Sequence, residues 1–274
     1  MIRLQPAKTF KFPVIAECIS PDVFQDKKAS EIGDLTAWEG NKQRKLADLF
    51  KIEDLEDAQP TGSIEIVIEG DVSKVRRIGS KMSGGTIRVR GNVGMHLGEE
   101  MAGGKIVVHG NADAWAGSMM KGGTIEIHGN AGDYLAAPYR GSTKGMHGGR
   151  IVVDGNVGNE AGAHMKTGLI KINGNAGQFV GLRMHDGTIY VQGNCDERAG
   201  ACMTDGKIIV GGKLQSVLPT FTVDSIRPKV KVDENETAQG PFYLFLGDLA
   251  ECGKGKLYVS KQKNPQLSSR ERFL

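Results

Sequence analysis

The stretch from Ile125 to Asn130, Ile-Glu-Ile-His-Gly-Asn, is one copy of a pattern that organises the middle of the chain. The pattern Ile-x-Val/Ile-x-Gly occurs eight times, and intervals of 21, 19, 19, 26, 19, 19 and 19 residues separate its glycines. These glycines are Gly70, Gly91, Gly110, Gly129, Gly155, Gly174, Gly193 and Gly212. The repeat is therefore 19 residues long, with two residues added in the first interval and seven in the fourth.

Each repeat begins with a short strand that has one buried face. An isoleucine stands four residues before every repeat glycine, and a second β-branched residue stands two before it. Such alternation predicts a strand, and the glycine, usually followed by asparagine, suits a corner. We expect the isoleucines to form one internal column: Ile66, Ile87, Ile106, Ile125, Ile151, Ile170, Ile189 and Ile208. A methionine column should lie beside it, because seven of the ten methionines recur at one position of the repeat.

The length of the repeat predicts the fold. A unit of 19 residues is too short for a βαβ crossover of about 30, but it suits a coil of short strands that pairs with the coil above. We therefore expect an all-β fold, a right-handed parallel β-helix. It would be a single-stranded solenoid of about eight 19-residue rungs, each rung being one repeat. The right hand is expected because crossovers between parallel strands are overwhelmingly right-handed.

The flanks should close the two ends of the array, because an open terminal rung is an aggregating edge. Residues 1–60 form the predicted N-terminal cap segment, 61–215 the glycine-repeat β-helix, and 216–274 the C-terminal cap strands and tail. The caps are expected to contain a turn over 37–41, a short helix over 43–50, and strands over 241–246 and 256–259.

The composition of the chain argues against a nucleic-acid partner, a membrane partner and a cysteine-based metal or redox site. The 274 residues include 35 basic and 32 acidic side chains, a balance that suggests neither a nucleic-acid nor a membrane partner. The N-terminus has no apolar signal segment, so a cytoplasmic protein is expected. The four cysteines form no CxxC pair, which argues against a zinc site, a redox pair or an iron-sulfur cluster in this chain.

No set of residues in the sequence matches a known arrangement of catalytic groups. The glycine-rich turns recur in every repeat without a following helix, so they fail the context of a phosphate loop. His109 and His128 share a column on adjacent rungs, but this column also holds Glu69, Arg90 and Asp154 and is expected to face solvent. No nucleophile-base set or carboxylate pair stands out. We therefore expect no catalytic, metal-binding or cofactor-binding residues here.

One recurring position of the repeat and the long insertion carry residues typical of protein interfaces. Five residues after successive repeat glycines come His96, Trp115, Tyr134, Glu160, Phe179 and Arg198. The seven-residue insertion should leave the rod as a loop around 136–144, with Tyr139 and Arg140 at its tip. Aromatic residues and arginine are favoured at interfaces, although the rings could simply pack under a loop and the insertion could be a tolerated one. The predicted docking residues are Trp115, Tyr134, Tyr139, Arg140 and Phe179.

The rungs resemble the glycine-repeat domain in the large chain of glutamate synthase, which is a right-handed β-helix. Over its whole length the chain resembles the C subunit of archaeal formylmethanofuran dehydrogenase. The residues that carry this resemblance include Pro21-Asp22-Val23-Phe24, Glu39-Gly40-Asn41, Tyr139-Arg140-Gly141 and the Gly145-Met146-x-Gly-Gly end of the long rung.

That resemblance implies a non-catalytic scaffold subunit of a complex that reduces carbon dioxide with ferredoxin electrons and formylates methanofuran in methanogenesis. The implied partners are a formate-dehydrogenase-like subunit with a molybdopterin or tungstopterin, an amidohydrolase-like subunit with a dinuclear metal site, and iron-sulfur subunits. The alternatives are the C subunit of the bacterial formyltransferase/hydrolase complex, which lacks carbon dioxide reduction, or a protein with a glutamate-synthase-like β-helix domain.

Overall fold

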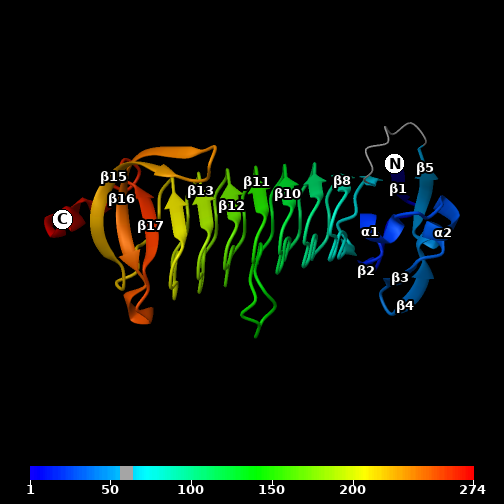
Figure 1. Cartoon of the computed structure of the whole chain (residues 1–274), viewed down its shortest axis with the longest axis horizontal. Helices are drawn as coiled ribbons and strands as arrows, with labels where there is room; N and C mark the ends of the chain where they lie inside the picture. Colours follow the sequence, from blue (N-terminus) through cyan, green and yellow to red (C-terminus); the bar gives the residue numbers. More distant parts are fainter. Residues whose placement is uncertain (56–63) are drawn as a thin grey trace.

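The computed structural model of the chain describes residues 1–55 and 64–274, and short β-strands joined by turns make up most of its regular secondary structure (Figure 1). Its α-helices, α1 (Pro21–Phe24) and α2 (Ala29–Gly33), are each about one turn long. The predicted all-β class is confirmed. Among the described helices, none is long and apolar enough to cross a membrane.

Every repeat contributes one strand to a 13-stranded sheet, and successive strands pair in parallel. They stand in a row along the long axis of the molecule (Figure 1). The repeat strands are β6 (Glu65–Glu69), β8 (Thr86–Arg90), β9 (Lys105–Val108), β10 (Thr124–Ile127), β11 (Arg150–Val153), β12 (Leu169–Ile172), β13 (Thr188–Val191) and β14 (Lys207–Val210).

The pairing register places equivalent residues of the repeats side by side. Ile125 of β10, for example, pairs with Ile106 on one side and with Ile151 on the other. All eight repeat isoleucines are no more than 1% exposed. Burial of one isoleucine side chain stabilises a fold by about 1.5–3 kcal/mol, so this column is a main source of stability. The methionines at the recurring position are also fully buried: Met82, Met101, Met120, Met146, Met165, Met184 and Met203.

A second line of parallel contacts follows the corners of the repeats. Single bridges link Val72, Val93, Ala112, Ala131, Val157, Ala176, Cys195 and Leu214 in succession. The corner asparagines support this line, because the side-chain oxygen of each accepts a hydrogen bond from a backbone N–H one repeat later. Asn130 Oδ1 thus accepts from the N–H of Asn156, at 2.8 Å. The side-chain oxygens of five other asparagines accept equivalent bonds: Asn92, Asn111, Asn156, Asn175 and Asn194.

The N-terminal segment closes one end of the sheet. Strand β1 (Ile2–Pro6) pairs in parallel with β6 and antiparallel with β5 (Phe50–Asp54). A four-stranded sheet lies beside it, formed by β4 (Lys42–Lys45), β3 (Thr36–Glu39), β2 (Val14–Ile15) and β7 (Val75–Arg76). The predicted boundary between residues 60 and 61 lies outside the described residues.

The helix predicted over 43–50 is wrong. Residues Lys42–Lys45 form β4, which pairs with β3 across the turn at Gly40 and Asn41. A 3₁₀ turn, η1 (Leu46–Asp48), then leads into β5. Strand pairing and the complete burial of Leu46 and Leu49 outweigh the local helix propensity of this segment.

The C-terminal segment continues the sheet at the other end. Strand β17 (Gly255–Ser260) pairs in parallel with β14, and β16 (Thr237–Gly247) and β15 (Thr222–Lys231) follow as antiparallel neighbours. The strands predicted over 241–246 and 256–259 lie within β16 and β17. Two 3₁₀ segments, η2 (Leu249–Glu251) and η3 (Pro265–Phe273), complete the chain.

Candidate docking surface

An aromatic stack runs across three neighbouring repeats. The rings of His96 and Trp115 stack with centroids 5.4 Å apart and an interplanar angle of 18°. Trp115 and Tyr134 stack more closely, at 4.5 Å and 15°. The stack arises because these residues occupy equivalent positions of successive repeats, and adjacent strands lie about 4.8 Å apart.

The backbone at these stacked positions is unusual. His96, Trp115 and Tyr134 have φ angles of 62°, 60° and 64°, in the left-handed region that favours glycine. A non-glycine residue there costs about 1–2 kcal/mol. The same backbone conformation recurs at the equivalent position of other repeats, for example at Glu160 and Arg198, so it belongs to the turn of the repeat. The large rings distinguish these three positions from the others.

The long loop between β10 and β11 extends away from the row of strands (Figure 1), but the side chain of Tyr139 folds back onto the aromatic stack. Its ring lies 5.2 Å from that of His96, and its hydroxyl accepts a hydrogen bond of 2.9 Å from Arg77 Nη2. Tyr139 and Arg140 stand at the turn of the loop, which a hydrogen bond from the Ser142 N–H to the Tyr139 carbonyl oxygen closes, but the Tyr139 side chain packs back against the repeats. Contact with His96 and Arg77 fixes the ring against the repeats.

Arg140 is exposed and contacts the other end of the stack, at Tyr134. Its guanidinium lies 6.0 Å from the centroid of the Tyr134 ring, and Nη2 donates a hydrogen bond of 3.1 Å to the Tyr134 hydroxyl. The fold thus brings Trp115, Tyr134, Tyr139 and Arg140 together. We call these four residues the loop patch.

Phe179 does not join the loop patch. Glu160 occupies the equivalent position of the repeat between Tyr134 and Phe179 and interrupts the column. Phe179 pairs instead with Arg198 of the next repeat, whose guanidinium lies 5.1 Å from the ring centroid. It forms a second, separate aromatic-arginine contact on the same column.

A charged cluster underlies the loop patch. The Arg77 guanidinium lies 2.6 Å from Glu17 and 3.5 Å from Glu99, whose side chain is only 4% exposed. Burial, together with the nearby Glu99 carboxylate, raises the pKa of Tyr139, so its hydroxyl stays protonated at neutral pH. Burial lowers the pKa of His96. These charged contacts anchor Tyr139, and with it the base of the loop.

Arg77, Glu99 and Glu17 belong to this surface although no predicted docking residue lies among them. Arg77 could have been found, because it stands 19 residues before His96, one period earlier in the same column. Its φ of 64° matches the rest of the column. Glu17 lies in the N-terminal segment, and no periodicity in the sequence connects it with the repeats.

The other histidine, cysteine and carboxylate side chains form no reactive arrangement in the described ranges. The ring centroids of His109 and His128 lie 5.2 Å apart in a tilted arrangement, and His128 Nδ1 lies 2.7 Å from Asp154, but all three side chains are solvent-exposed. Burial raises the pKa of Cys18 to about 11 and that of Cys195 to about 12, so both remain weakly nucleophilic thiols. Within residues 1–55 and 64–274, no three of these side chains form a group that would suit a metal ion.

No protein-family model matches the chain. Known proteins with similar sequences include the C subunits of tungsten- and molybdenum-containing formylmethanofuran dehydrogenases. Over 96 residues the chain is 42% identical to the C subunit of tungsten-containing formylmethanofuran dehydrogenase 2 from Methanothermobacter wolfeii, a match that covers 35% of each protein. Over 94 residues it is 40% identical to the C subunit of molybdenum-containing formylmethanofuran dehydrogenase 1 from Methanosarcina barkeri, covering 34% of the chain and 31% of that protein. The matched region thus spans about a third of the length of these relatives.

A solved structure extends the similarity to nearly the whole chain. It is the crystal structure of the formyltransferase/hydrolase complex from Methylorubrum extorquens with methylofuran. One chain of that complex superposes with a TM-score of 0.81 at 32% sequence identity, and the match covers 94% of the present chain and 99% of that chain.

Proposed function

The chain belongs to the family that includes the C subunit of formylmethanofuran dehydrogenase and a chain of the formyltransferase/hydrolase complex, and from this membership we propose that it is a non-catalytic scaffold subunit of such a complex. The single observation that carries the proposal is the 42% identity to the C subunit of a formylmethanofuran dehydrogenase. In the proposed complex, carbon dioxide is reduced with ferredoxin electrons and methanofuran is formylated.

A specific observation favours the alternative complex. The similarity to a chain of the formyltransferase/hydrolase complex covers 94% of this chain, whereas the identity to the dehydrogenase subunits covers about a third. The alternative is therefore a role as the corresponding subunit of a formyltransferase/hydrolase complex, without carbon dioxide reduction.

We infer that the array winds as a right-handed parallel β-helix. Its support is the combination of in-register parallel strands with a second line of parallel bridges at the corners, which gives every repeat two contacts with the next. In this proposal, residues 1–60 cap one end, 61–215 form the helix, and 216–274 cap the other. The interior is filled by isoleucine, valine and methionine side chains, as suits a rigid scaffold.

The proposed partners supply the chemistry. They are a pterin-containing formate-dehydrogenase-like subunit, an amidohydrolase-like subunit with a dinuclear metal site, and iron-sulfur subunits, assembled in the cytoplasm. The loop patch is the proposed docking surface for one of these chains. Its support is the arrangement of two stacked rings, a fixed tyrosine and an exposed arginine, since aromatic residues and arginine dominate binding energy at interfaces.

Purification of the tagged chain from its native source tests the choice of complex. Co-purifying pterin and iron-sulfur subunits, with tungsten or molybdenum detected by metal analysis, are the expected result for the dehydrogenase. A formyltransferase partner without a pterin metal would support the alternative. Recovery of the chain without any partner would contradict both.

The docking surface is tested by two matched double variants. Tyr134→Ala/Arg140→Ala removes an aromatic-arginine contact of the loop patch, while Phe179→Ala/Arg198→Ala removes the equivalent contact outside it. Partner recovery should fall only in the first, with both variants folded by circular dichroism. Equal recovery of partners by the two variants would rule out the loop patch as the anchor.

A further inference from the structure

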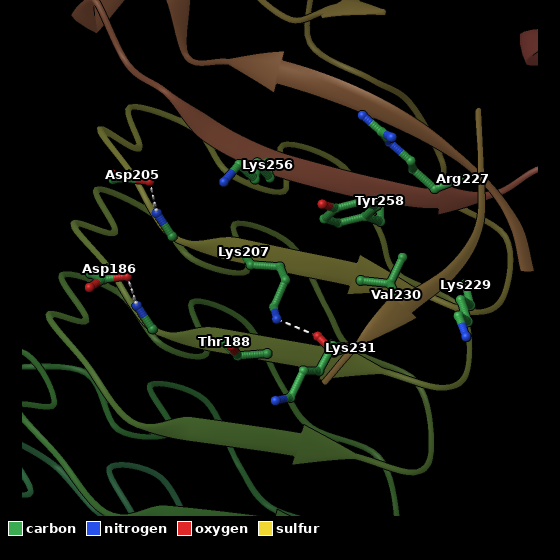
Figure 2. A pocket seen from close by; sticks show the side chains of 12 residues that line it. Asp186, Thr188, Asp205, Lys207, Arg227, Lys229, Val230, Lys231, Lys256 and Tyr258 are labelled. Atoms are coloured by element: carbon green, nitrogen blue, oxygen red, sulfur yellow. Dashed lines mark hydrogen bonds between the residues drawn. The ribbon is translucent and has the colours of Figure 1, made fainter. Parts of the chain in front are cut away.

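A basic cleft lies at the opposite end of the array from the N-terminal cap. It has a volume of about 410 Å³ and opens between the outer face of β13, β14 and β17 and the strand β15, which crosses above them (Figure 2). Five cationic side chains line it: Lys207, Lys256, Arg227, Lys229 and Lys231. They come from three strands that are distant in sequence, so the sequence pattern gave no sign of the cleft.

The floor of the cleft places like charges next to each other. Thr188, Lys207 and Lys256 occupy equivalent positions of three adjacent parallel strands. Neighbouring strands lie about 4.8 Å apart, and like charges directly opposite each other destabilise a sheet. Burial, followed by the charges of Lys256 and Lys231, lowers the pKa of Lys207. The cations therefore repel one another in the protein alone.

The acidic groups of the lining are fewer than the cations, so they offset only part of the positive charge. Asp186 and Asp205 line one end of the cleft, where each side chain accepts a hydrogen bond of 2.7 Å from the backbone N–H of the following glycine (Figure 2). Arg227 has a carboxylate partner, Asp224, at 3.9 Å. For the four lysines of the cleft, no ion pair within 4.0 Å occurs in the part of the chain that the structure describes.

The cleft also holds donors in fixed positions. The Lys207 ammonium donates to the backbone carbonyl oxygen of Lys231, which ties the floor to the crossing strand (Figure 2). Tyr258 lies between the floor and Arg227, and burial raises the pKa of its hydroxyl, which therefore remains a donor.

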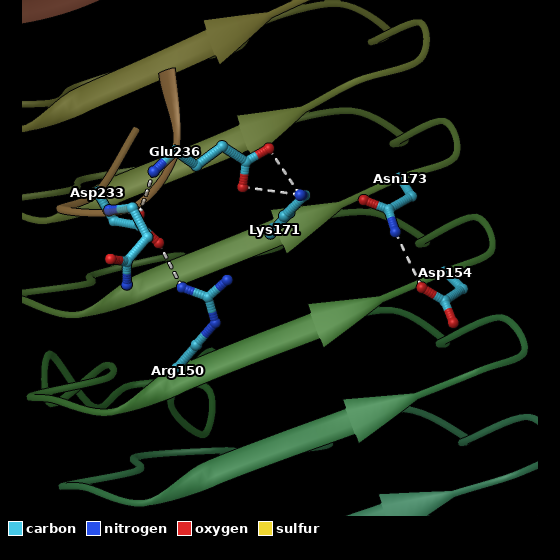
Figure 3. A network of polar contacts seen from close by, with 7 residues as sticks. Arg150, Asp154, Lys171, Asn173, Asp233 and Glu236 are labelled. Atoms are coloured by element: carbon cyan, nitrogen blue, oxygen red, sulfur yellow. Dashed lines mark hydrogen bonds and ion pairs between the residues drawn. The ribbon is translucent and has the colours of Figure 1, made fainter. Parts of the chain in front are cut away.

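Ion pairs hold the crossing strand over the sheet, so the cleft is preformed. At the tip of the β15–β16 hairpin, Asp233 pairs with Arg150 of β11, and Glu236 accepts two hydrogen bonds of 2.7 Å from Lys171 of β12 (Figure 3). Apolar contacts add to this attachment, because Val230 and Val232 pack on Ile209 in a small separate cluster. A preformed site binds its ligand without the cost of ordering a loop.

We propose that this cleft binds a small multivalent anion that carries two or more carboxylate or phosphate groups. Each anionic group would lie between neighbouring cations and relieve their repulsion, and charge-assisted hydrogen bonds are the strongest that a protein forms. A single carboxylate would engage only part of the charge. This binding site is independent of the proposed scaffold role and of the loop patch, which lies on other repeats.

Calorimetric titration of the full chain at low ionic strength tests this inference, with pyrophosphate and citrate as the probes and acetate as a monovalent comparison. Pyrophosphate or citrate should bind, and acetate should bind at least about tenfold more weakly. Lys207→Gln should weaken binding about tenfold, as expected for loss of one charged hydrogen bond. Lys27→Gln removes an exposed charge near the other end of the molecule and should leave the affinity unchanged.

The pattern of binding identifies the ligand chemistry. Binding of pyrophosphate alone indicates a phosphate-bearing ligand, and binding of citrate alone indicates a polycarboxylate. Circular dichroism and thermal unfolding would establish that both lysine variants are folded. Absence of binding by both probes, or an equal loss of affinity in Lys207→Gln and Lys27→Gln, would overturn the inference.

Discussion

Gly98 lies directly against the core isoleucine of the next repeat but one: a Cβ atom on Gly98 would stand 2.7 Å from Cδ1 of Ile125. The φ angle of Gly98 is +61°, which an L-residue rarely adopts. The glycine thus meets two needs at once, since it permits this turn of the backbone and leaves room for the isoleucine column. Glycine recurs at the equivalent position of other repeats for the same reason, as at Gly117 against Ile151 and Gly162 against Ile189.

Gly98→Ala should therefore destabilise the protein, by about 2–4 kcal/mol from backbone strain and overpacking together. Urea unfolding followed by circular dichroism measures the loss. Gly84→Ala is the matched control, because a Cβ there meets no atom within 4 Å and the backbone is not in the left-handed region. Equal stabilities of the two variants would show that the close approach to Ile125 is not limiting.

Ile127 belongs to the column of β-branched residues that stand two positions before the repeat glycines, and it tests whether this column faces inward. Its side chain is 1% exposed and it pairs with Val108 and Val153. Ile127→Asp buries a carboxylate among apolar side chains and should cost several kcal/mol, enough to abolish soluble folded protein. Thr124→Asp puts the same group on the outer face of the same strand, beside Lys105 and Arg150. Expression and thermal unfolding should be normal for Thr124→Asp, and a stable Ile127→Asp protein would contradict the assigned register.

The corner asparagines should contribute individually to stability. Asn130→Ala removes the acceptor for the Asn156 N–H and is expected to lower the free energy of unfolding by about 1 kcal/mol. Asn130→Asp keeps an acceptor oxygen at that place and should lose less. Chemical denaturation of the three proteins provides the measurement, and a larger loss for the aspartate variant would argue against the hydrogen bond as the cause.

His96 should make stability depend on pH. Burial is the main cause of its lowered pKa; the cations Arg76 and Arg77 act in the same direction, while the carboxylates of Glu99 and Asp113 oppose them. The folded protein therefore binds fewer protons at His96 than the unfolded chain, whose histidines titrate near about 6.5. Stability from this group is present above that pH and is lost as the pH falls below it.

Unfolding free energies at pH 7.5 and about 5.5 measure this dependence. His96→Gln should show a smaller decrease between the two pH values than the parent chain. His185→Gln replaces an exposed histidine and should retain the decrease of the parent. An unchanged decrease in His96→Gln would show that another group is responsible.

The sequence by itself determined which residues share a column. Isoleucine, methionine and glycine recur with a period of 19, and repeats of equal length that pair in parallel must bring equivalent residues into register. The all-β class, the burial of Ile125 and the pairing of His109 with His128 follow from that period alone. Local pattern is sufficient there because each contact is one repeat away.

Only the tertiary structure decided the conformation and contacts of the segments that do not follow the 19-residue repeat. The segment 42–50 became a strand and a 3₁₀ turn because β3 and the buried core were available to it, against its local helix propensity. Tyr139 turned back to Arg77, across 62 residues of sequence, and the β15–β16 hairpin folded over the sheet through Asp233 and Glu236 to roof the basic cleft. These contacts join segments of different periodicity or none, so their free energies depend on neighbours that no local pattern identifies.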